Sequence, residues 1–225
     1  MTAATPRPAP APSMRLESGS PKIAGRAAPP RLSRRALPRD TVALARFLIG
    51  KTLVHEIGGG RLSGRIVETE AYLVGDAASH AFRGETRRNR AMFLKRGHAY
   101  VYIAYGCWPV LNVTSEDAGI GAAVLLRALE PLGGIETMRR HRGVARDVDL
   151  ARGPGRLAAA MSVSLAHDGI DLCGRGPLYL AAAHGKTGPV AVTPRIGISK
   201  DAHLPLRFFE RGNRFVSGPR RRIGG

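Results

Sequence analysis

The chain has 225 residues, 44% of them hydrophobic, which is enough to bury one substantial core. No stretch approaches the roughly 20 apolar residues of a membrane-spanning helix, and no apolar signal-peptide segment lies near Met1. The two cysteines, Cys107 and Cys173, lie far apart and lack Cys-x-x-Cys spacing, which argues against a disulfide framework and a structural zinc site. We therefore expect a cytoplasmic protein without membrane association.

Net charge is the strongest feature of the composition, at +18 with a sequence pI near 11.3. Residues 1–39 contribute +7 and residues 218–225 contribute +3, which leaves +8 on residues 40–217. A folded body this basic favours a polyanionic partner, because phosphates that bind Lys and Arg release their counterions. The alternative is a basic domain whose charge serves only solubility.

The composition divides the chain into three parts. Residues 1–37 mix Pro, Ala, Ser and scattered Arg without apolar periodicity, which predicts a disordered basic arm. The frequent prolines argue against an amphipathic mitochondrial presequence. A single domain is expected over 38–217, followed by a basic tail over 218–225.

The first predicted elements are a helix and a β-hairpin. Asp40 is a suitable N-cap for a helix over 41–49, which Gly50 ends. Two strands, 51–57 and 61–72, follow and are joined by a glycine turn.

A second hairpin is predicted further along the chain. Residues 98–106 are rich in aromatic side chains and read as a strand, with Tyr105-Gly106 at the tip and 110–114 as the returning strand. The apolar run 121–130 predicts a central strand that Arg127 interrupts and Pro131 ends.

The remaining elements are short. Helices are expected over 135–141 and 156–161, and strand-like pieces over 194–198 and 206–209. The Gly153-Pro154-Gly155 turn, with Arg156 behind it, could bind a phosphate or be a plain loop. No regular strand–helix alternation or internal repeat is present, so the fold class is mixed α/β rather than a Rossmann sheet.

One stretch combines an acid, an aromatic ring and an imidazole. In a strand, alternate side chains share a face, so Glu68, Glu70 and Tyr72 are expected to project together beside Ile66. His80 follows within eight residues and is close enough to fold back on Tyr72. A buried carboxylate is costly unless it is paired or performs chemistry, so this stretch is a candidate site.

A structural interpretation of the same stretch is that its acids pair with nearby arginines, such as Arg83 or Arg88. The segment 185–187 resembles a phosphate-binding loop only faintly, because that pattern needs glycine where this chain has Leu180. The histidines form no His-x-x-x-His pair, and we expect no metal and no cofactor.

Five motifs occur in a fixed order along the chain. They are Arg-Ile-Val-Glu-Thr-Glu-Ala-Tyr at 65–72, His80, Tyr-Val-Tyr-Ile-Ala-Tyr-Gly at 100–106, Leu-Asn-Val at 111–113 and Leu-Leu-Arg-Ala-Leu-Glu-Pro at 125–131. Together they resemble the alkyladenine (3-methyladenine) DNA glycosylase family of the non-helix-hairpin-helix kind. The resemblance runs from about residue 40 to about residue 217 and continues through Pro-Arg-Ile-Gly-Ile at 194–198 and Leu-Arg-Phe-Phe at 206–209.

The resemblance implies a single mixed α/β domain, with a curved antiparallel sheet, surrounding helices and a protruding β-hairpin that enters the DNA minor groove. It implies a base-excision repair enzyme that flips alkylated or deaminated purines out of duplex DNA and hydrolyses the N-glycosidic bond. The partner is double-stranded DNA with damaged purines, and the protein is expected to be a monomer, associated with the nucleoid, or nuclear in a eukaryote.

The resemblance also implies a role for each matched residue. Glu70 is the general base for the attacking water, and Arg127 lies near that water and the phosphate. Tyr72, His80 and Tyr102 enclose the flipped base, Asn112 rejects the exocyclic amine of guanine, and Tyr105 fills the gap left in the duplex. If the partner is DNA, backbone contacts are expected from the basic residues Arg88, Arg156 and Arg195.

The chemistry of the substrate agrees with these roles. A base inside a stacked duplex is out of reach and must be rotated out, and aromatic stacking tolerates varied bases. An alkylated purine is a good leaving group, so one carboxylate can suffice where sugar hydrolases use two. No lysine in the motifs is placed to form a Schiff base, which predicts a monofunctional enzyme. The tip residues Cys107-Trp108-Pro109 depart from the usual family pattern.

Two other functions fit parts of the pattern. A non-enzymatic nucleic-acid-binding module of the same fold class would use the charge but leave Glu70 and His80 idle. A metal-dependent nuclease would use Glu68 and Glu70 as ligands, but it lacks a third acid and a histidine at strand spacing. Activity that survives EDTA separates the glycosylase from the nuclease.

Overall fold

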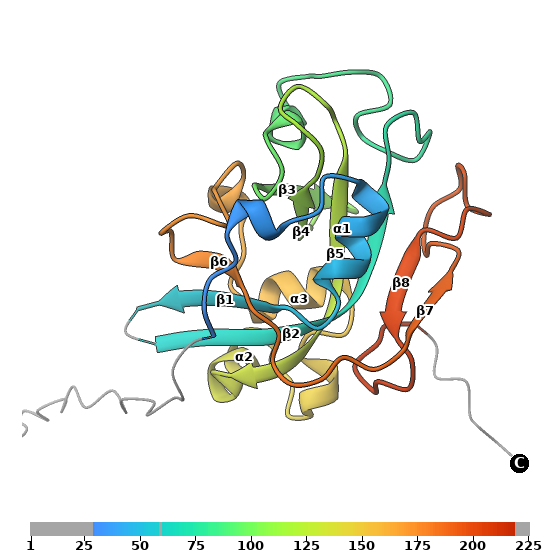
Figure 1. Cartoon of the computed structure of the whole chain (residues 1–225). Coiled ribbons are helices and arrows are strands. Elements are labelled where there is room, and N and C mark those ends of the chain that lie inside the picture. The colour runs from blue at the N-terminus through green and yellow to red at the C-terminus, as the bar shows by residue number, and fades with distance from the viewer. Residues whose placement is uncertain (1–28, 59, 219–225) are drawn as a thin grey trace, which may run out of the picture.

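The computed structural model describes residues 29–58 and 60–218. Among them, eight strands form one sheet in the order β3-β4-β5-β2-β1-β6, with β8 on β2 and β7 on β8, and all its strand pairings are antiparallel (Figure 1). The predicted mixed α/β single domain with a curved antiparallel sheet is confirmed. The strands are β1 (Thr52–Ile57), β2 (Gly60–Tyr72), β3 (Ala99–Ala104), β4 (Trp108–Thr114), β5 (Ala123–Gly133), β6 (Leu178–Ala181), β7 (Val190–Thr193) and β8 (Arg207–Glu210).

Three α-helices accompany the sheet in the part of the chain that the structure describes. The Asp40 carboxylate accepts a hydrogen bond from the Ala43 N–H at 2.7 Å and caps the first helix, as predicted. The helices are α1 (Thr41–Leu48), α2 (Ile135–Arg142) and α3 (Pro154–Ala160), with short 3-10 turns η1 (Arg34–Ala36), η2 (Arg90–Phe93), η3 (Asp147–Asp149) and η4 (Leu165–His167). None of the described helices is long and apolar enough to cross a membrane.

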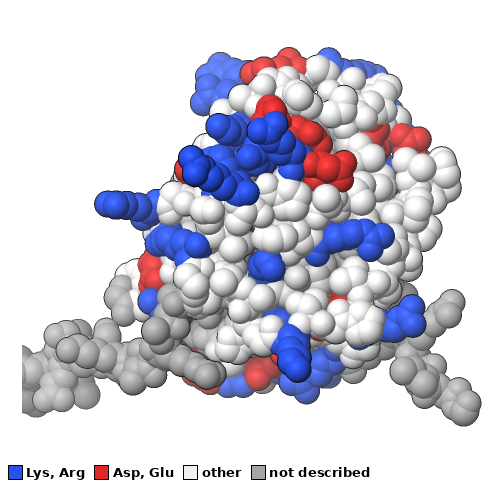
Figure 2. Space-filling view, viewed as in Figure 1, with Lys and Arg blue, Asp and Glu red and all other residues white. Residues whose placement is uncertain are grey.

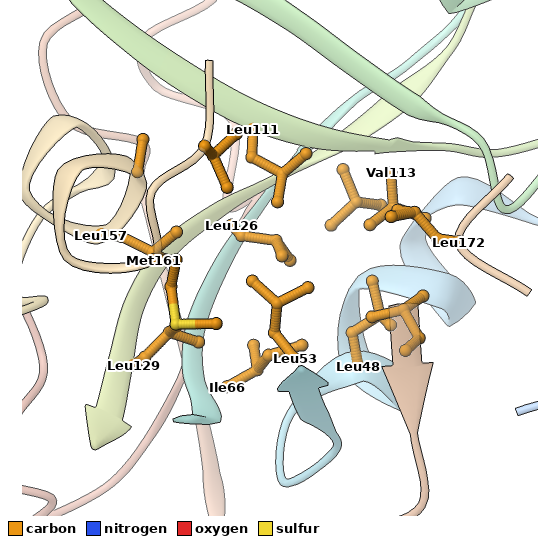
Figure 3. Close-up of a cluster of buried hydrophobic side chains, with 14 of the residues drawn as sticks. Leu48, Leu53, Ile66, Leu111, Val113, Leu126, Leu129, Leu157, Met161 and Leu172 are labelled. Carbon is orange, nitrogen blue, oxygen red and sulfur yellow. The ribbon is translucent and has the colours of Figure 1, made fainter. Parts of the chain in front are cut away.

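The sheet curls around one hydrophobic core, which α1 and α3 close (Figures 1 and 3). Helix α1 contributes Leu44 and Leu48 to this core, and α3 contributes Leu157. Each of these three side chains is fully buried, which stabilises the fold by about 1.5–3 kcal/mol per leucine. The core therefore fixes the central strands on which the candidate site stands.

Strand β2 is the centre of the sheet and changes its neighbour along its length. It pairs with β5 from Ser63 to Tyr72, while its other edge pairs first with β1 and then, from Glu68 to Glu70, with β8. The register shifts where this change occurs: Val67 on β2 and Arg127 on β5 each stand without a partner. Such bulges turn the following side chains and are common beside active sites.

This register shift overturns the expectation that Ile66 lies beside Glu68. Ile66 packs in the main core, whereas Val67 packs with Ala128 and Phe215 in a separate cluster. Strict alternation would have placed Val67 and Glu68 on opposite faces of the sheet. Because of the bulge, both lie on the same face.

The β3–β4 hairpin matches the predicted tip. Ala104 pairs with Trp108 across the turn, and Tyr105 and Gly106 both have positive φ, at 50° and 75°. The Tyr105 side chain is 85% exposed, so the hairpin presents an aromatic ring to solvent. The returning strand begins at Trp108, two residues before the predicted start.

Two strand predictions were wrong. Strand β5 does not end at Pro131 but continues to Gly133, because Pro131 pairs with Gly64 beside a register shift where a missing N–H is tolerated. The strand near 194–198 is β7, at 190–193, and residues 194–198 form a loop with Gly197 at φ 77°.

The predicted arm over 1–37 is wrong in its last part. The Leu32 N–H donates to the Leu180 carbonyl at 2.9 Å, the Ala182 N–H donates to the Pro30 carbonyl at 2.8 Å, and Leu37 is buried in the core. Residues 29–37 therefore belong to the domain and cover β6, a strand that the sequence analysis missed. Residues 1–28 and 219–225, which hold the rest of the predicted arm and most of the predicted tail, lie outside the described residues.

Candidate active site

A cleft of about 1080 Å³ opens between the β3–β4 hairpin, the loop after β2, the start of α3 and the loop after β7. Its aromatic side chains include Tyr72, His80, Tyr102 and Tyr105. Six basic residues line it and, among the described residues, no Asp or Glu does; the six are Arg83, Arg88, Arg127, Arg142, Arg156 and Lys200. The cleft therefore suits a flat aromatic group attached to an anion.

The basic residues of the cleft have few acidic partners. On the face shown in Figure 2, basic side chains gather in groups, and the largest group lies directly beside acidic side chains. Those neighbouring acids neutralise part of the positive potential. Of the six basic residues that line the cleft, Arg127 alone forms an ion pair with a carboxylate among the described residues, so the lining as a whole favours an anionic ligand.

The rings of His80, Tyr100 and Tyr102 form one wall of the cleft. The His80 and Tyr102 ring centroids lie 4.4 Å apart, and His80 Nδ1 lies 2.8 Å from the Tyr100 hydroxyl. His80 is exposed as a whole residue, but partial burial of its imidazole, together with nearby Arg88, lowers its pKa. Burial and the charge of Glu70 raise the pKa of Tyr102 to about 12, so both rings are uncharged at neutral pH.

Tyr72 stands on β2 above Glu70. Its hydroxyl donates to Glu70 Oε2 at 3.1 Å, and the Arg195 guanidinium lies 4.7 Å from its ring centroid on the buried side. Burial and the neighbouring Glu70 carboxylate raise the pKa of the phenol well above its ordinary value. Tyr72 therefore remains a hydrogen-bond donor to the carboxylate.

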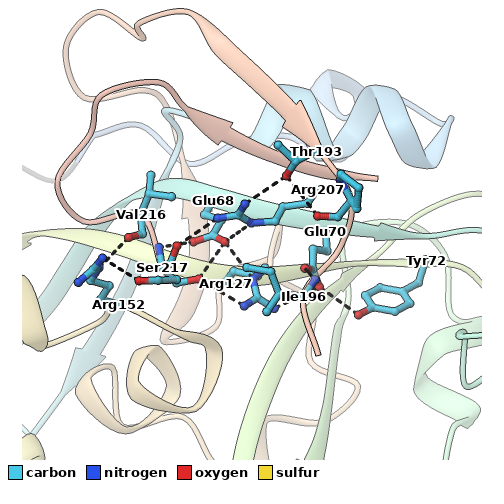
Figure 4. A network of polar contacts seen from close by, with 12 residues as sticks. Glu68, Glu70, Tyr72, Arg127, Arg152, Thr193, Ile196, Arg207, Val216 and Ser217 are labelled. Carbon is cyan, nitrogen blue, oxygen red and sulfur yellow. Dashed lines mark hydrogen bonds and ion pairs between the residues drawn. The ribbon is translucent and has the colours of Figure 1, made fainter. Parts of the chain in front are cut away.

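Glu70 is fully buried and lies close to Tyr72, Arg127 and Ile196 (Figure 4). Its Oε1 accepts from the Ile196 N–H at 2.8 Å, and its Oε2 accepts from Tyr72 and lies 3.2 Å from Arg127 Nη1. Tyr72, Ile196 and Arg127 all line the cleft. A carboxylate has about four acceptor positions, so the three protein contacts leave one for a ligand.

Glu68 is equally buried but has a different environment (Figure 4). It accepts from Arg127 Nε at 3.0 Å, from Arg207 Nε at 2.6 Å, and from the N–H and hydroxyl of Ser217 at 2.6 and 2.9 Å. Burial alone would raise the pKa of Glu68, but the two guanidiniums outweigh it and lower the pKa. These four contacts occupy its acceptor positions.

These contacts correct the ion-pair partners that the sequence suggested for Glu68 and Glu70. Neither acid forms an ion pair with Arg83 or Arg88 in the described structure; their partners come from β5 and β8. Arg127 projects from the bulge on β5 and bridges the two acids with Nε and Nη1. Burial would lower the pKa of Arg127, but Glu70 and Glu68 together raise it, so the side chain stays charged.

Asn112 lies under the cleft rather than in its lining. The residue is buried, and its Nδ2 donates to the Tyr100 carbonyl at 3.1 Å. It pairs across β4 and β5 with Leu125, which does line the cleft. Asn112 thus faces the same side of the sheet as the aromatic wall.

The three arginines expected at the DNA backbone occupy different environments. Arg88 and Arg156 are exposed and line the cleft. Arg195 is fully buried and forms an ion pair with Asp76, with a further bond to the Ala71 carbonyl at 3.0 Å. This burial contradicts the phosphate contact expected of Arg195, because its side chain is shielded from solvent and its two terminal nitrogens bond inside the protein.

The sequence analysis missed three groups at the site: Arg207, Ser217 and the backbone N–H of Ile196. A second buried carboxylate beside Glu70 needs a second positive charge to pair with it. This requirement was the feature of the sequence that indicated an arginine such as Arg207. No pattern in the sequence signals a backbone N–H donor. Among the described residues, no group of three or more His, Cys, Asp or Glu side chains could hold a metal ion.

Comparison with known proteins identifies the relatives of this chain. The family model described as Methylpurine-DNA glycosylase matches residues 35–214. A protein of Mesorhizobium japonicum is 62% identical over 191 residues, covering 85% of this chain and 92% of its own length. One of Paraburkholderia phytofirmans is 53% identical over 84% of this chain and 89% of its own, and one of Chlorobium phaeobacteroides is 45% identical over 80% and 92%. All three carry the name "Putative 3-methyladenine DNA glycosylase".

Proposed function

The chain belongs to the methylpurine-DNA glycosylase family, and from that membership we propose how its cleft releases a damaged base. It is a hydrolase of N-glycosyl bonds that acts on methylated purines in DNA, with 3-methyladenine as the base named for its relatives. This sets aside the non-enzymatic module. The finer mechanism proposed below rests on one observation: Glu70 is buried beneath an aromatic, basic cleft with one acceptor position free.

We propose that the target nucleotide rotates out of the duplex into this cleft. The glycosidic bond of a stacked base cannot be reached by any buried carboxylate. Tyr72, His80 and Tyr102 line the cleft and offer aromatic faces to a flat base. Both His80 and Tyr102 are neutral, so these two rings add no positive charge next to a cationic alkylated purine.

In the proposed reaction Glu70 acts as the general base. A water on its free acceptor position gives a proton to the carboxylate while its oxygen bonds to the anomeric carbon of the sugar. The N-glycosidic bond breaks, and its electron pair leaves with the purine. Arg127 holds Glu70 in place and neutralises charge beside the sugar, and the Ile196 N–H fixes the other oxygen.

We assign the selection of the damaged base and the contacts to the DNA duplex to residues around the cleft. The Asn112 amide, which lies under the pocket floor, is proposed to disfavour guanine by opposing its exocyclic amine. Tyr105, exposed at the hairpin tip, is proposed to occupy the gap in the duplex. Arg88 and Arg156 are proposed to contact phosphates, and we expect the protein to act as a monomer.

The mechanism predicts a product that can be tested directly. With methylated duplex DNA, the free base should be released and the strand should remain intact with an abasic site. Borohydride should trap no protein–DNA adduct, because no amine of the enzyme bonds to the sugar. A trapped adduct with strand cleavage would contradict the water-based, monofunctional mechanism. EDTA should leave the rate unchanged.

A further inference from the structure

The segment 215–218 passes beside the two acids and is held along its backbone. Arg152 Nε donates to the Val216 carbonyl at 2.7 Å, and Arg152 Nη2 donates to the Gly218 carbonyl at 3.0 Å (Figure 4). Between them, Arg207 Nη2 donates to the Ser217 carbonyl at 3.1 Å. Phe215 is buried against Val67 and Ala128. Three successive carbonyls and one buried ring therefore fix this segment.

Ser217 uses this fixed position to contact two of the charged groups at once. Its N–H donates to Glu68 Oε2 at 2.6 Å, and its hydroxyl donates to Glu68 Oε1 at 2.9 Å. The same hydroxyl oxygen accepts from Arg127 Nη2 at 3.3 Å. One small residue thus joins the buried carboxylate to the arginine that holds Glu70.

The orientation of Arg127 depends on these contacts. A guanidinium is planar, with its donors in a fixed fork, so two occupied positions determine where the third points. Glu68 takes Nε and Ser217 takes Nη2, which leaves Nη1 facing Glu70 at 3.2 Å. Without them, the side chain could rotate away from Glu70 while remaining charged and buried.

We propose that Ser217 and Glu68 are positioning residues for the reaction, and that the segment 215–218 sets the catalytic geometry by holding the Arg127 guanidinium against Glu70. The inference rests on the proposed role of Glu70. It assigns a function to a part of the chain outside the cleft lining, 149 positions from Glu68 and 90 from Arg127.

The test compares Ser217→Ala with Ser217→Thr in the full chain, on duplex DNA with one methylated purine. Loss of hydrogen bonds to charged groups should slow single-turnover base release by roughly tenfold in Ser217→Ala. The dissociation constant for the damaged duplex should change less than about twofold, because Ser217 does not line the cleft. Threonine keeps the hydroxyl and should restore most of the rate.

Two controls separate positioning from general stability. Ser164→Ala removes a serine hydroxyl contact to His167, far along the chain from the acids, and should leave the rate unchanged. Truncation after Gly218 keeps the segment and should also leave single-turnover release unchanged at saturating protein. The rate of Ser217→Ala is compared at a temperature where urea titration shows both proteins to be folded.

The outcomes distinguish this inference from the proposed mechanism. A wild-type rate in folded Ser217→Ala, or a slow rate that threonine does not restore, would overturn the positioning role alone. Full activity in Glu70→Gln would instead overturn the general-base assignment, whatever the serine variants do. A slow rate in Ser217→Ala together with weaker binding would show that the segment serves DNA binding and would also overturn the inference.

Discussion

Two carboxylates on one strand, two residues apart and equally buried, have opposite surroundings. Glu68 accepts four hydrogen bonds from two arginines and Ser217, and has no acceptor position left. Glu70 accepts from Tyr72 and Ile196 and contacts Arg127, and three residues of the cleft surround it. Burial of an acid therefore does not indicate chemistry by itself. The decisive feature is an acceptor position that a ligand can still reach.

The largest effect should come from removing the base while keeping its shape. Glu70→Gln retains the side-chain volume but loses the proton acceptor, and general-base catalysis is worth about 10²- to 10⁴-fold. Single-turnover base release should fall by that factor, while binding of damaged duplex, measured by fluorescence anisotropy, should stay close to wild type.

The matched variant of this experiment is Glu68→Gln. Its release rate should fall no more than roughly tenfold once folded protein is compared, because Glu68 acts only through Arg127. If Glu70→Gln released base within a few-fold of wild type while Glu68→Gln did not, the two roles would have to be exchanged.

The next effect is on stability and belongs to Glu68. Removing one partner of a buried ion pair leaves the arginines uncompensated and should lower the free energy of unfolding by about 3–5 kcal/mol at pH 7. Urea titration of Glu68→Gln and wild type measures this difference directly. A loss under about 1 kcal/mol would show that the network contributes little to stability.

The pH dependence of the same variant has a definite sign. In the folded protein the pKa of Glu68 lies below the ordinary value of 4.5, so its contribution is fully present above that value. The contribution is lost as the pH falls below 4.5 through the folded-state pKa. Wild type should therefore lose stability more steeply than Glu68→Gln below pH 4.5, and parallel curves would contradict the pairing.

Much of this arrangement was accessible from the sequence because it depends on local signals. Asp40 marked the start of α1, the glycine turn marked the first hairpin, and Gly106 marked the exposed tip. The family resemblance named Glu70 and not Glu68 as the general base; this role stays a prediction, to which the structure adds that Glu68 has no acceptor position left whereas Glu70 has one. Short-range turn and capping chemistry was sufficient for these predictions.

The parts that could not be predicted depend on distant contacts or on a single extra residue. The bulges at Val67 and Arg127 reverse the faces of their strands, and strict alternation gives no sign of them. Arg207 lies 139 positions from Glu68, and the burial of Arg195 depends on Asp76, 119 positions away. Such pairings are decided by tertiary packing, which overrides local pattern.

A smaller effect should come from the hairpin tip, which touches neither acid. Tyr105→Ser removes an exposed ring worth about 1–3 kcal/mol by analogy with base–aromatic stacking. The equilibrium constant for flipping, read from the fluorescence of an ethenoadenine nucleotide, should fall about 5- to 150-fold. Leu165→Ser, an exposed apolar residue outside the cleft, is the control. Unchanged flipping would show that Cys107 or Trp108, and not Tyr105, occupies the gap that the flipped base leaves in the duplex.

The smallest effect on the rate should come from removing the hydroxyl of Tyr72, a hydrogen-bond donor that Glu70 has and Glu68 lacks. Tyr72→Phe keeps the ring proposed to stack on the base but removes one donor to Glu70, while the Ile196 N–H and Arg127 remain. One hydrogen bond is worth about 0.5–1.5 kcal/mol, so release should slow about 2- to 10-fold with unchanged binding.

Because the pKa of Tyr72 lies well above its ordinary value, the phenol keeps its proton, and the ratio of the wild-type rate to the Tyr72→Phe rate should be constant from pH 6 to about pH 9. Tyr179→Phe removes a similar hydroxyl that donates to Glu56 outside the cleft, and it should leave the rate unchanged. Equal rates in wild type and Tyr72→Phe would show that Glu70 is held by Arg127 and the backbone alone.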